Sequence, residues 1–178
     1  MKDRWWFVFA VVIAVVIVVG VSLLAKVRIG AGQPAAGGVL TEPKPTSFRS
    51  NGARIYWTGV DDQGKRAALS GGPSWVTMRG GSCVDCHGPD GRGGKQCMMG
   101  TAIPPDIRYG VLTGKIHEPG GEVMDHPPYT DATIKRAIGQ GLDPGNGKLD
   151  LTMPRWRMSE RDLNDLVAYL KELDTKKG

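Results

Sequence analysis

The sequence predicts one small, mainly α-helical domain that follows an N-terminal transmembrane helix. Residues 5–24 carry no charge, and about twenty helical residues span the roughly 30 Å hydrocarbon core of a bilayer. Near the other end, apolar residues recur at helical spacing between positions 163 and 173, which is typical of a helix packed on a core. The 178 residues include 26 glycines and 12 prolines, which favours one modest domain with long irregular segments and excludes a large two-domain enzyme.

The net charge and the cysteine content exclude some classes of function. The net charge is +5, but the 23 basic and 18 acidic residues are interspersed, without the basic stripe that nucleic-acid binding needs. We therefore expect no nucleic-acid partner. Three cysteines, two of them in one short motif, are too few for a disulfide-stapled fold and indicate a cofactor site.

Residues 1–25 are predicted to be a retained membrane anchor. Trp5 and Trp6 stand at the start of the apolar run, where aromatic residues suit the membrane interface. The run is longer than the roughly 7–15 apolar residues of a cleaved signal, although cleavage after Ala31 or Ala36 is the alternative. Two basic residues precede the run and two follow it, so the positive-inside rule does not fix the orientation.

The chain after the anchor divides into a linker and a domain. Residues 26–48 are rich in Gly, Ala and Pro with no sustained period, which predicts a linker. Residues 49–178 form the predicted domain, whose first part, 49–69, has a β-like pattern. Within it, Ile55–Thr58 is predicted to be a short strand or hairpin, followed by a turn over residues 59–64.

Two helices are predicted in the middle of the domain. Pro73–Arg79 suits a short helix because a glycine precedes it and a proline opens it, and Trp75 should face the last helix. A longer helix begins at Thr130–Asp131 and is ended by Gly139 and Gly141. Its apolar residues recur at helical spacing: Ile134, Ala137 and Ile138.

A third helix is predicted at the C-terminus. Ser159 is its expected N-cap, with Asp162 three residues on. Its core-facing side chains form one stripe: Leu163, Leu166, Val167, Tyr169, Leu170 and Leu173.

The motif that carries chemistry is Cys83-Val84-Asp85-Cys86-His87. This C-x-x-C-H spacing is the signature of covalent haem c attachment, because each thiol can add across one vinyl group while His87 becomes the proximal iron ligand. A redox disulfide or half a zinc site is the alternative. The sequence has no second cysteine pair for zinc and no βαβ pattern around the motif.

The chain resembles the mono-haem class I cytochromes c over most of residues 70–175. Cys83–Gly88 matches the attachment helix and its exit, Ile103–Ile107 the proline-bearing proximal loop, and Leu151–Pro154 the distal ligand loop. The resemblance implies a class I cytochrome c fold, in which a few short helices surround one covalently bound haem c. It also implies that the carbonyl of Pro105 or Pro104 accepts a hydrogen bond from the proximal histidine.

Met153 is the expected distal iron ligand. It lies 66 residues after His87, in a polar, glycine-rich stretch that leads into the last helix. The other methionines are expected to pack or have no supporting context: Met1, Met78, Met98, Met99, Met124 and Met158. Ligation by His117 or His126 instead would make a bis-His haem of lower potential.

For several residues the sequence leaves two interpretations open. The two histidines, with Glu118, Glu122 and Asp125, could form a second metal site, although the spacing is not that of a known motif. Cys97 could pair with a partner chain, but packing near the haem edge is favoured. Arg155 and Trp156 could contact the haem propionates or form part of a solvated turn.

The resemblance implies a function and a location. Haem c is attached on the outer side of a bacterial cytoplasmic membrane, which implies an inside N-terminus and residues 26–178 in the periplasm or its equivalent. We expect a single-electron carrier between a quinol-oxidising complex and a terminal oxidase or reductase, with no small-molecule substrate. The alternatives are a haem enzyme or gas sensor with an open distal site, and a fixed subunit whose Ala10, Ala14 and Gly20 contact another helix.

Overall fold

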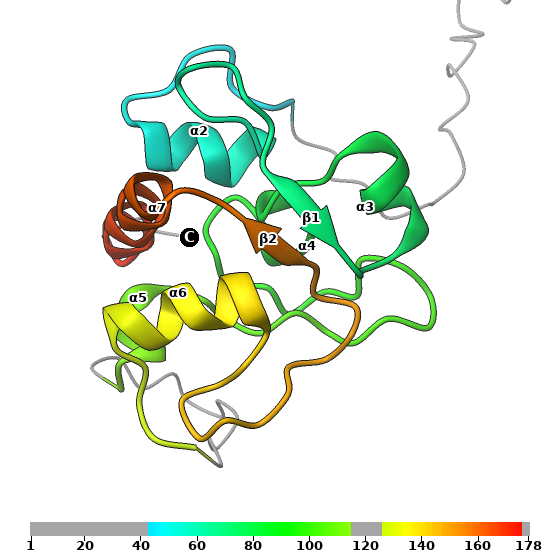
Figure 1. Ribbon diagram of the computed structural model, residues 1–178, viewed down its shortest axis with the longest axis vertical. Helices are drawn as coiled ribbons and strands as arrows, with labels where there is room; N and C mark the ends of the chain where they lie inside the picture. The colour runs from blue at the N-terminus through cyan, green and yellow to red at the C-terminus, as the bar shows by residue number, and fades with distance from the viewer. Residues whose placement is uncertain (1–42, 115–125, 176–178) are drawn as a thin grey trace, which may run out of the picture. The chain divides into compact units, whose positions relative to one another are not determined.

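The computed structural model describes residues 43–114 and 126–175. Within these residues the elements follow the order α2, β1, α3, α4, α5, α6, β2, α7 (Figure 1). No helix in this part of the chain is long and apolar enough to span a membrane. The predicted anchor, 1–25, and residues 26–42 of the predicted linker lie outside the described residues.

Helix α2 (Asn51–Thr58) opens the domain. The Ser50 side chain caps it by accepting from the Ala53 amide at 3.2 Å, and Gly59 ends it at a φ of 68°. The prediction of a strand at Ile55–Thr58 is therefore wrong. Its β-branched and aromatic residues form a helix because burial against α7 (Glu160–Leu173) outweighs their β propensity.

A two-stranded antiparallel sheet joins distant parts of the domain. Strand β1 (Ala68–Ser70) pairs with β2 (Arg155–Arg157), so that Leu69 lies opposite Trp156. A separate bridge between Val60 and Arg66 closes the predicted turn. The β character expected over 49–69 is confined to this bridge and to the start of β1.

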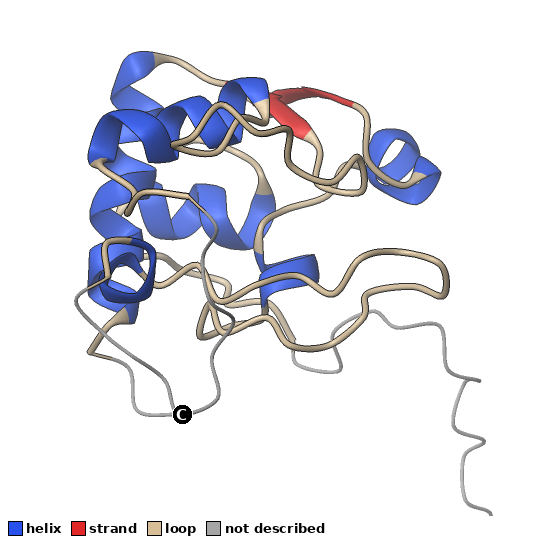
Figure 2. Cartoon of the chain, turned by 90° about the horizontal axis from the view of Figure 1, so that it is seen from below, coloured by secondary structure: helices blue, strands red, loops and turns tan. Residues whose placement is uncertain are grey.

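Three short helices lie between the strands: α3 (Ser74–Arg79), α4 (Val84–His87) and α5 (Tyr109–Leu112). Figures 1 and 2 show α3 on the opposite side of the domain from α7. The prediction that Trp75 faces the last helix is therefore wrong, because α2 occupies that position.

The two later helices confirm the sequence prediction. Thr130 caps α6 (Asp131–Gln140) through a reciprocal capping box with Thr133, and Gly141 ends the helix in the left-handed region. Gly139 lies inside the helix and does not end it. Ser159 caps α7 by accepting from the Asp162 amide at 3.1 Å. Five of the six stripe residues are buried and Leu163 is partly buried.

The core is formed mainly by α2, α6 and α7, which bury aromatic and branched side chains against one another. Trp57 of α2 donates to the Tyr169 hydroxyl of α7 at 3.0 Å inside this core. Figure 2 shows most helices gathered on one side of the domain and long loops extending from them. This helical core supports the loops that carry the predicted site residues.

Candidate haem site

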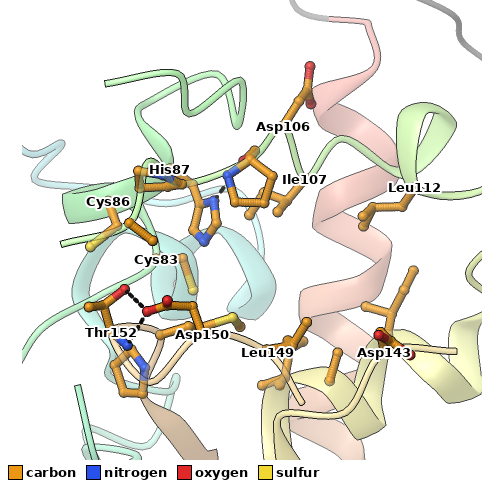
Figure 3. Close-up of a pocket in the computed structure, with 18 of the residues that line it drawn as sticks. Cys83, Cys86, His87, Asp106, Ile107, Leu112, Asp143, Leu149, Asp150 and Thr152 are labelled. Carbon is orange, nitrogen blue, oxygen red and sulfur yellow. Dashed lines mark hydrogen bonds between the residues drawn. The ribbon is translucent and has the colours of Figure 1, made fainter. Parts of the chain in front are cut away.

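One cavity of about 1420 Å³ brings the predicted site residues together (Figure 3). Its wall includes Cys83, Cys86, His87, Met153 and Trp156, together with apolar side chains of α6 and α7. Sites for small ligands typically measure about 300–1,000 Å³, so this cavity suits a larger group. The attachment motif and the loop with the expected distal ligand therefore border one space.

His87 is buried at the end of α4, with 7% of its surface exposed. Its Nδ1 lies 3.0 Å from the carbonyl oxygen of Pro105, one of the two partners that the resemblance implies. A carbonyl only accepts, so Nδ1 carries the proton and donates. Burial lowers the pKa of His87, opposed by the hydrogen bond to Pro105. The neutral ring therefore has its Nε2 lone pair available for a metal.

The segment that carries Pro105 is fixed by backbone hydrogen bonds. Gly93 donates to the His87 carbonyl at 2.9 Å, and Gly94 donates to the Pro104 carbonyl at 2.9 Å. A Cβ on Gly93 would lie 2.1 Å from the Pro104 oxygen and 2.6 Å from the Pro105 oxygen. Only glycine fits at position 93, and nothing in the local sequence pattern indicates this contact.

Cys83 and Cys86 are free thiols at the cavity wall. Burial raises the pKa of Cys83 to about 12, and burial together with the Cys97 thiol raises that of Cys86. Both therefore stay protonated near neutral pH. Thioether formation needs reduced cysteines rather than a disulfide, and both side chains are free.

A polar contact fixes the start of the motif. The Asp85 carboxylate accepts from the Ser82 amide at 2.8 Å and the Ser82 hydroxyl at 2.7 Å. Lys44 forms an ion pair with Asp85 at 2.9 Å and donates to Ser82 at the same distance. The end of the linker is thus attached to the turn from which α4 begins.

Met153 is half-buried in a tight loop. Asp150 accepts from the Thr152 amide at 2.8 Å and the Thr152 hydroxyl at 2.7 Å, as Figure 3 shows. The Met153 amide donates to the Asp150 carbonyl at 3.2 Å, and Gly72 donates to the Leu151 carbonyl at 3.2 Å. The structure places Met153 at the same cavity as His87, while its ligation of iron stays a prediction.

The remaining methionines differ from expectation in part. Met158 packs against the core as predicted. Met78 is 83% exposed and Met99 is 93% exposed, so the prediction that they pack is wrong. Helix α3 buries only Val76, which leaves Met78 on its outer face. Met98, at 42% exposure, begins a turn closed by Thr101.

Cys97 is buried beside Cys86 at the cavity wall, as the packing interpretation predicted.

His126 also borders the cavity. Its Nδ1 lies 2.9 Å from the Pro127 carbonyl oxygen, and its ring meets that of Tyr129 edge to face. His117 and the nearby acidic residues lie outside the described residues. Among residues 43–114 and 126–175, no cluster of His, Cys, Asp or Glu forms a metal site.

Trp156 and Arg155 occupy different environments. Trp156 is buried and lines the cavity, so the solvated-turn interpretation does not hold for this side chain, and its propionate contact stays a prediction. Arg155 is not among the described residues that line it. Its guanidinium donates to the backbone carbonyls of Leu149, Asp150 and Met153, and its contact with haem propionates stays a prediction.

These residues fit a covalently attached haem. Two free thiols and an oriented imidazole border one mainly apolar cavity, and a thioether borders the same space. The set contains both attachment groups and one nitrogen ligand, which is the chemistry of haem c.

Comparison with known proteins agrees with this arrangement. The family model for cytochrome c matches residues 51–174, which is well over half of the chain and includes α2 through α7. No curated protein and no solved structure matches the chain. The match shows that the chain belongs to the cytochrome c family, whose members bind haem c covalently and transfer electrons.

Proposed function

We propose that the chain is a membrane-anchored electron carrier with a single haem c, ligated by His87 and Met153. The observation that carries this proposal is the shared cavity, which both attachment cysteines, the His87 imidazole and the Met153 loop border. Bound haem supplies a one-electron ferrous/ferric couple there. If His87 and Met153 both ligated the iron of a bound haem, no substrate would need to reach it.

The protein's own residues adjust this couple. Pro105 holds the His87 ring in one tautomer and makes it a better electron donor. A thioether from Met153 favours the ferrous state relative to a second imidazole, so the potential is higher than for bis-His ligation. The apolar side chains of α6 and α7 limit solvent access, which is a further influence on the potential.

The partners and location follow from the same chemistry. We place residues 1–25 in the cytoplasmic membrane and the haem domain on its outer side, because the run 5–24 is uncharged and long enough to span it. A His/Met haem suits transfer from a quinol-oxidising complex toward a terminal oxidase or reductase. Purification in mild detergent distinguishes a free carrier, which comes away alone, from a fixed subunit.

A redox titration of the full chain in detergent tests the proposal. We expect one haem iron per chain, a single one-electron transition, and a ferrous form that does not bind carbon monoxide rapidly. Rapid binding to the wild-type protein would favour the enzyme or gas-sensor alternative.

Topology is tested by a cysteine introduced at Met78, which is 83% exposed. A membrane-impermeant thiol reagent should label it from the periplasmic side of intact cells. Labelling only after the cytoplasmic side is opened would contradict the orientation.

A further inference from the structure

The loop that carries Met153 folds around the side chain of Arg155. The guanidinium donates to the carbonyl oxygens of Leu149 at 2.9 Å and Asp150 at 3.5 Å, and also to that of Met153 itself. Three carbonyls of one five-residue segment therefore point at one cation. Hydrogen bonds from a charged donor are among the stronger ones in proteins.

The fold reserves space for this guanidinium. Gly141, the residue that ends α6, has a φ of 68°, and a Cβ there would lie 1.7 Å from Arg155 Nε. The Gly141 carbonyl also accepts from the Leu149 amide at 2.9 Å. Arg155 thus lies between the end of α6 and the start of the loop, where any larger residue at position 141 would displace it.

The backbone of Arg155 is itself fixed. It belongs to β2 and pairs with Ser70 of β1, and the next residue, Trp156, is buried. The side chain therefore starts from a rigid strand and ends on a loop without regular structure. A planar guanidinium can donate to several carbonyls at once, which the single ammonium group of lysine cannot reproduce.

We propose that Arg155 is a positioning residue for Met153: its guanidinium holds the carbonyls of Leu149, Asp150 and Met153 so that the thioether is kept at the haem cavity. The proposal rests on the proposed function, in which Met153 is the distal ligand. Without the guanidinium the loop opens more often, Met153 leaves the iron more often, and an external ligand can take its place.

Imidazole binding to the ferric holoprotein measures this opening directly. Arg155→Leu should bind imidazole about tenfold more tightly or better, the change expected from losing a charge-assisted hydrogen bond. Arg155→Lys should lie between this variant and the wild type. Gly141→Ala should match Arg155→Leu, because it displaces the guanidinium without removing its charge.

Two matched variants serve as controls for lost charge and lost stability. Arg157→Leu removes an exposed arginine from the same strand and should leave imidazole affinity unchanged. Tyr169→Phe removes the hydroxyl that accepts from Trp57, so it should lower stability without loosening the loop. The proposal is overturned if Arg155→Leu and Gly141→Ala bind imidazole like the wild type, or if Tyr169→Phe strengthens binding equally. If Arg155→Leu does not fold, Gly141→Ala and Arg155→Lys decide.

Met153→Ala separates this proposal from the proposed function. If it binds imidazole no more tightly than the wild type, Met153 is not the ligand and both proposals fail. If Met153→Ala binds more tightly but Arg155→Leu does not, only the role of Arg155 fails.

Discussion

The Tyr56 hydroxyl donates a hydrogen bond of 2.6 Å to the carbonyl oxygen of Gly88. Tyr56 lies in α2, and Gly88 directly follows His87 at the end of α4. The tyrosine side chain is fully buried, and burial raises its pKa far above its ordinary value, so the hydroxyl stays protonated. This bond joins the first helix of the domain to the exit from the haem-attachment motif.

Tyr56→Phe tests the strength of this connection. The variant leaves the Gly88 carbonyl with only the longer bond from the Gly91 amide at 3.4 Å, so the free energy of unfolding should fall by about 0.5–1.5 kcal/mol. Denaturant unfolding measures the change. Tyr109→Phe, which removes an exposed bond to Asp131, should cost less. Equal losses of unfolding free energy in the two variants would show that the buried Tyr56 bond contributes no more than the exposed Tyr109 bond.

Gly93→Ala should alter the proximal histidine. A Cβ at position 93 would collide with the Pro104 and Pro105 carbonyls, which should weaken the bond from His87 to Pro105. The imidazole then donates less electron density to ferric iron, and the reduction potential should rise. Redox titration measures the shift.

Gly94→Ala is the matched variant for this test. Gly94 has a φ of 74°, close to the 61° of Gly93, but its Cβ would come no nearer than 4.0 Å to the atoms around it. It should therefore share the backbone strain, roughly 1 kcal/mol, without changing the potential. Equal potentials in both variants would contradict the proximal role of the Pro104–Pro105 segment.

Covalent attachment predicts a clear extraction result. Haem should extract into acidified organic solvent from the double variant in which Cys83 and Cys86 are both serine, but not from the wild type. Cys97→Ser should retain its haem, because Cys97 lies outside the motif. Extraction from the intact wild-type protein would show that the attachment assignment is wrong.

Asp131 should contribute to stability in a pH-dependent way. Hydrogen bonds from Lys171, at 2.9 Å, and then from Tyr109 lower the pKa of this carboxyl group. The stabilisation is present above the unfolded-state pKa of about 4 and is lost as pH falls through the lower native value. Because the pair is exposed, it is worth less than about 1 kcal/mol.

Asp131→Asn provides the comparison. Its stability should fall less steeply than that of the wild type between neutral pH and about pH 3, as followed by denaturant midpoints. The same steepness in both proteins would mean that Asp131 carries no pH-dependent stability.

Patterns within short stretches of the sequence predict much of the site. The C-x-x-C-H motif identifies its own chemistry, and Thr130 and Ser159 cap their helices as their side-chain chemistry predicts. The family resemblance implies Pro105 or Pro104 as the acceptor, and the Pro105 carbonyl is the one that accepts from His87. Each of these assignments depends on a few residues that are close in sequence or belong to a shared pattern.

The unpredicted features depend on contacts between distant residues. Ile55–Thr58 has strand-like composition, and only packing against α7 shows why it is helical. The residues next to Arg155 in the sequence do not predict its role, because its partners are backbone carbonyls whose direction depends on the folded loop. Gly93 and Tyr56 likewise act on Pro104 and Gly88, which the linear pattern does not connect to them.

Magnetic circular dichroism of the ferric protein tests the central claim, ligation by Met153, most directly. The wild type should show the charge-transfer band of a thioether bound to ferric haem. Met153→Ala should lose that band, while Met158→Ala should keep it and lose only packing stability, on the order of 1–3 kcal/mol. A thioether band that persists in Met153→Ala, or that is missing from the wild type, would contradict ligation by Met153.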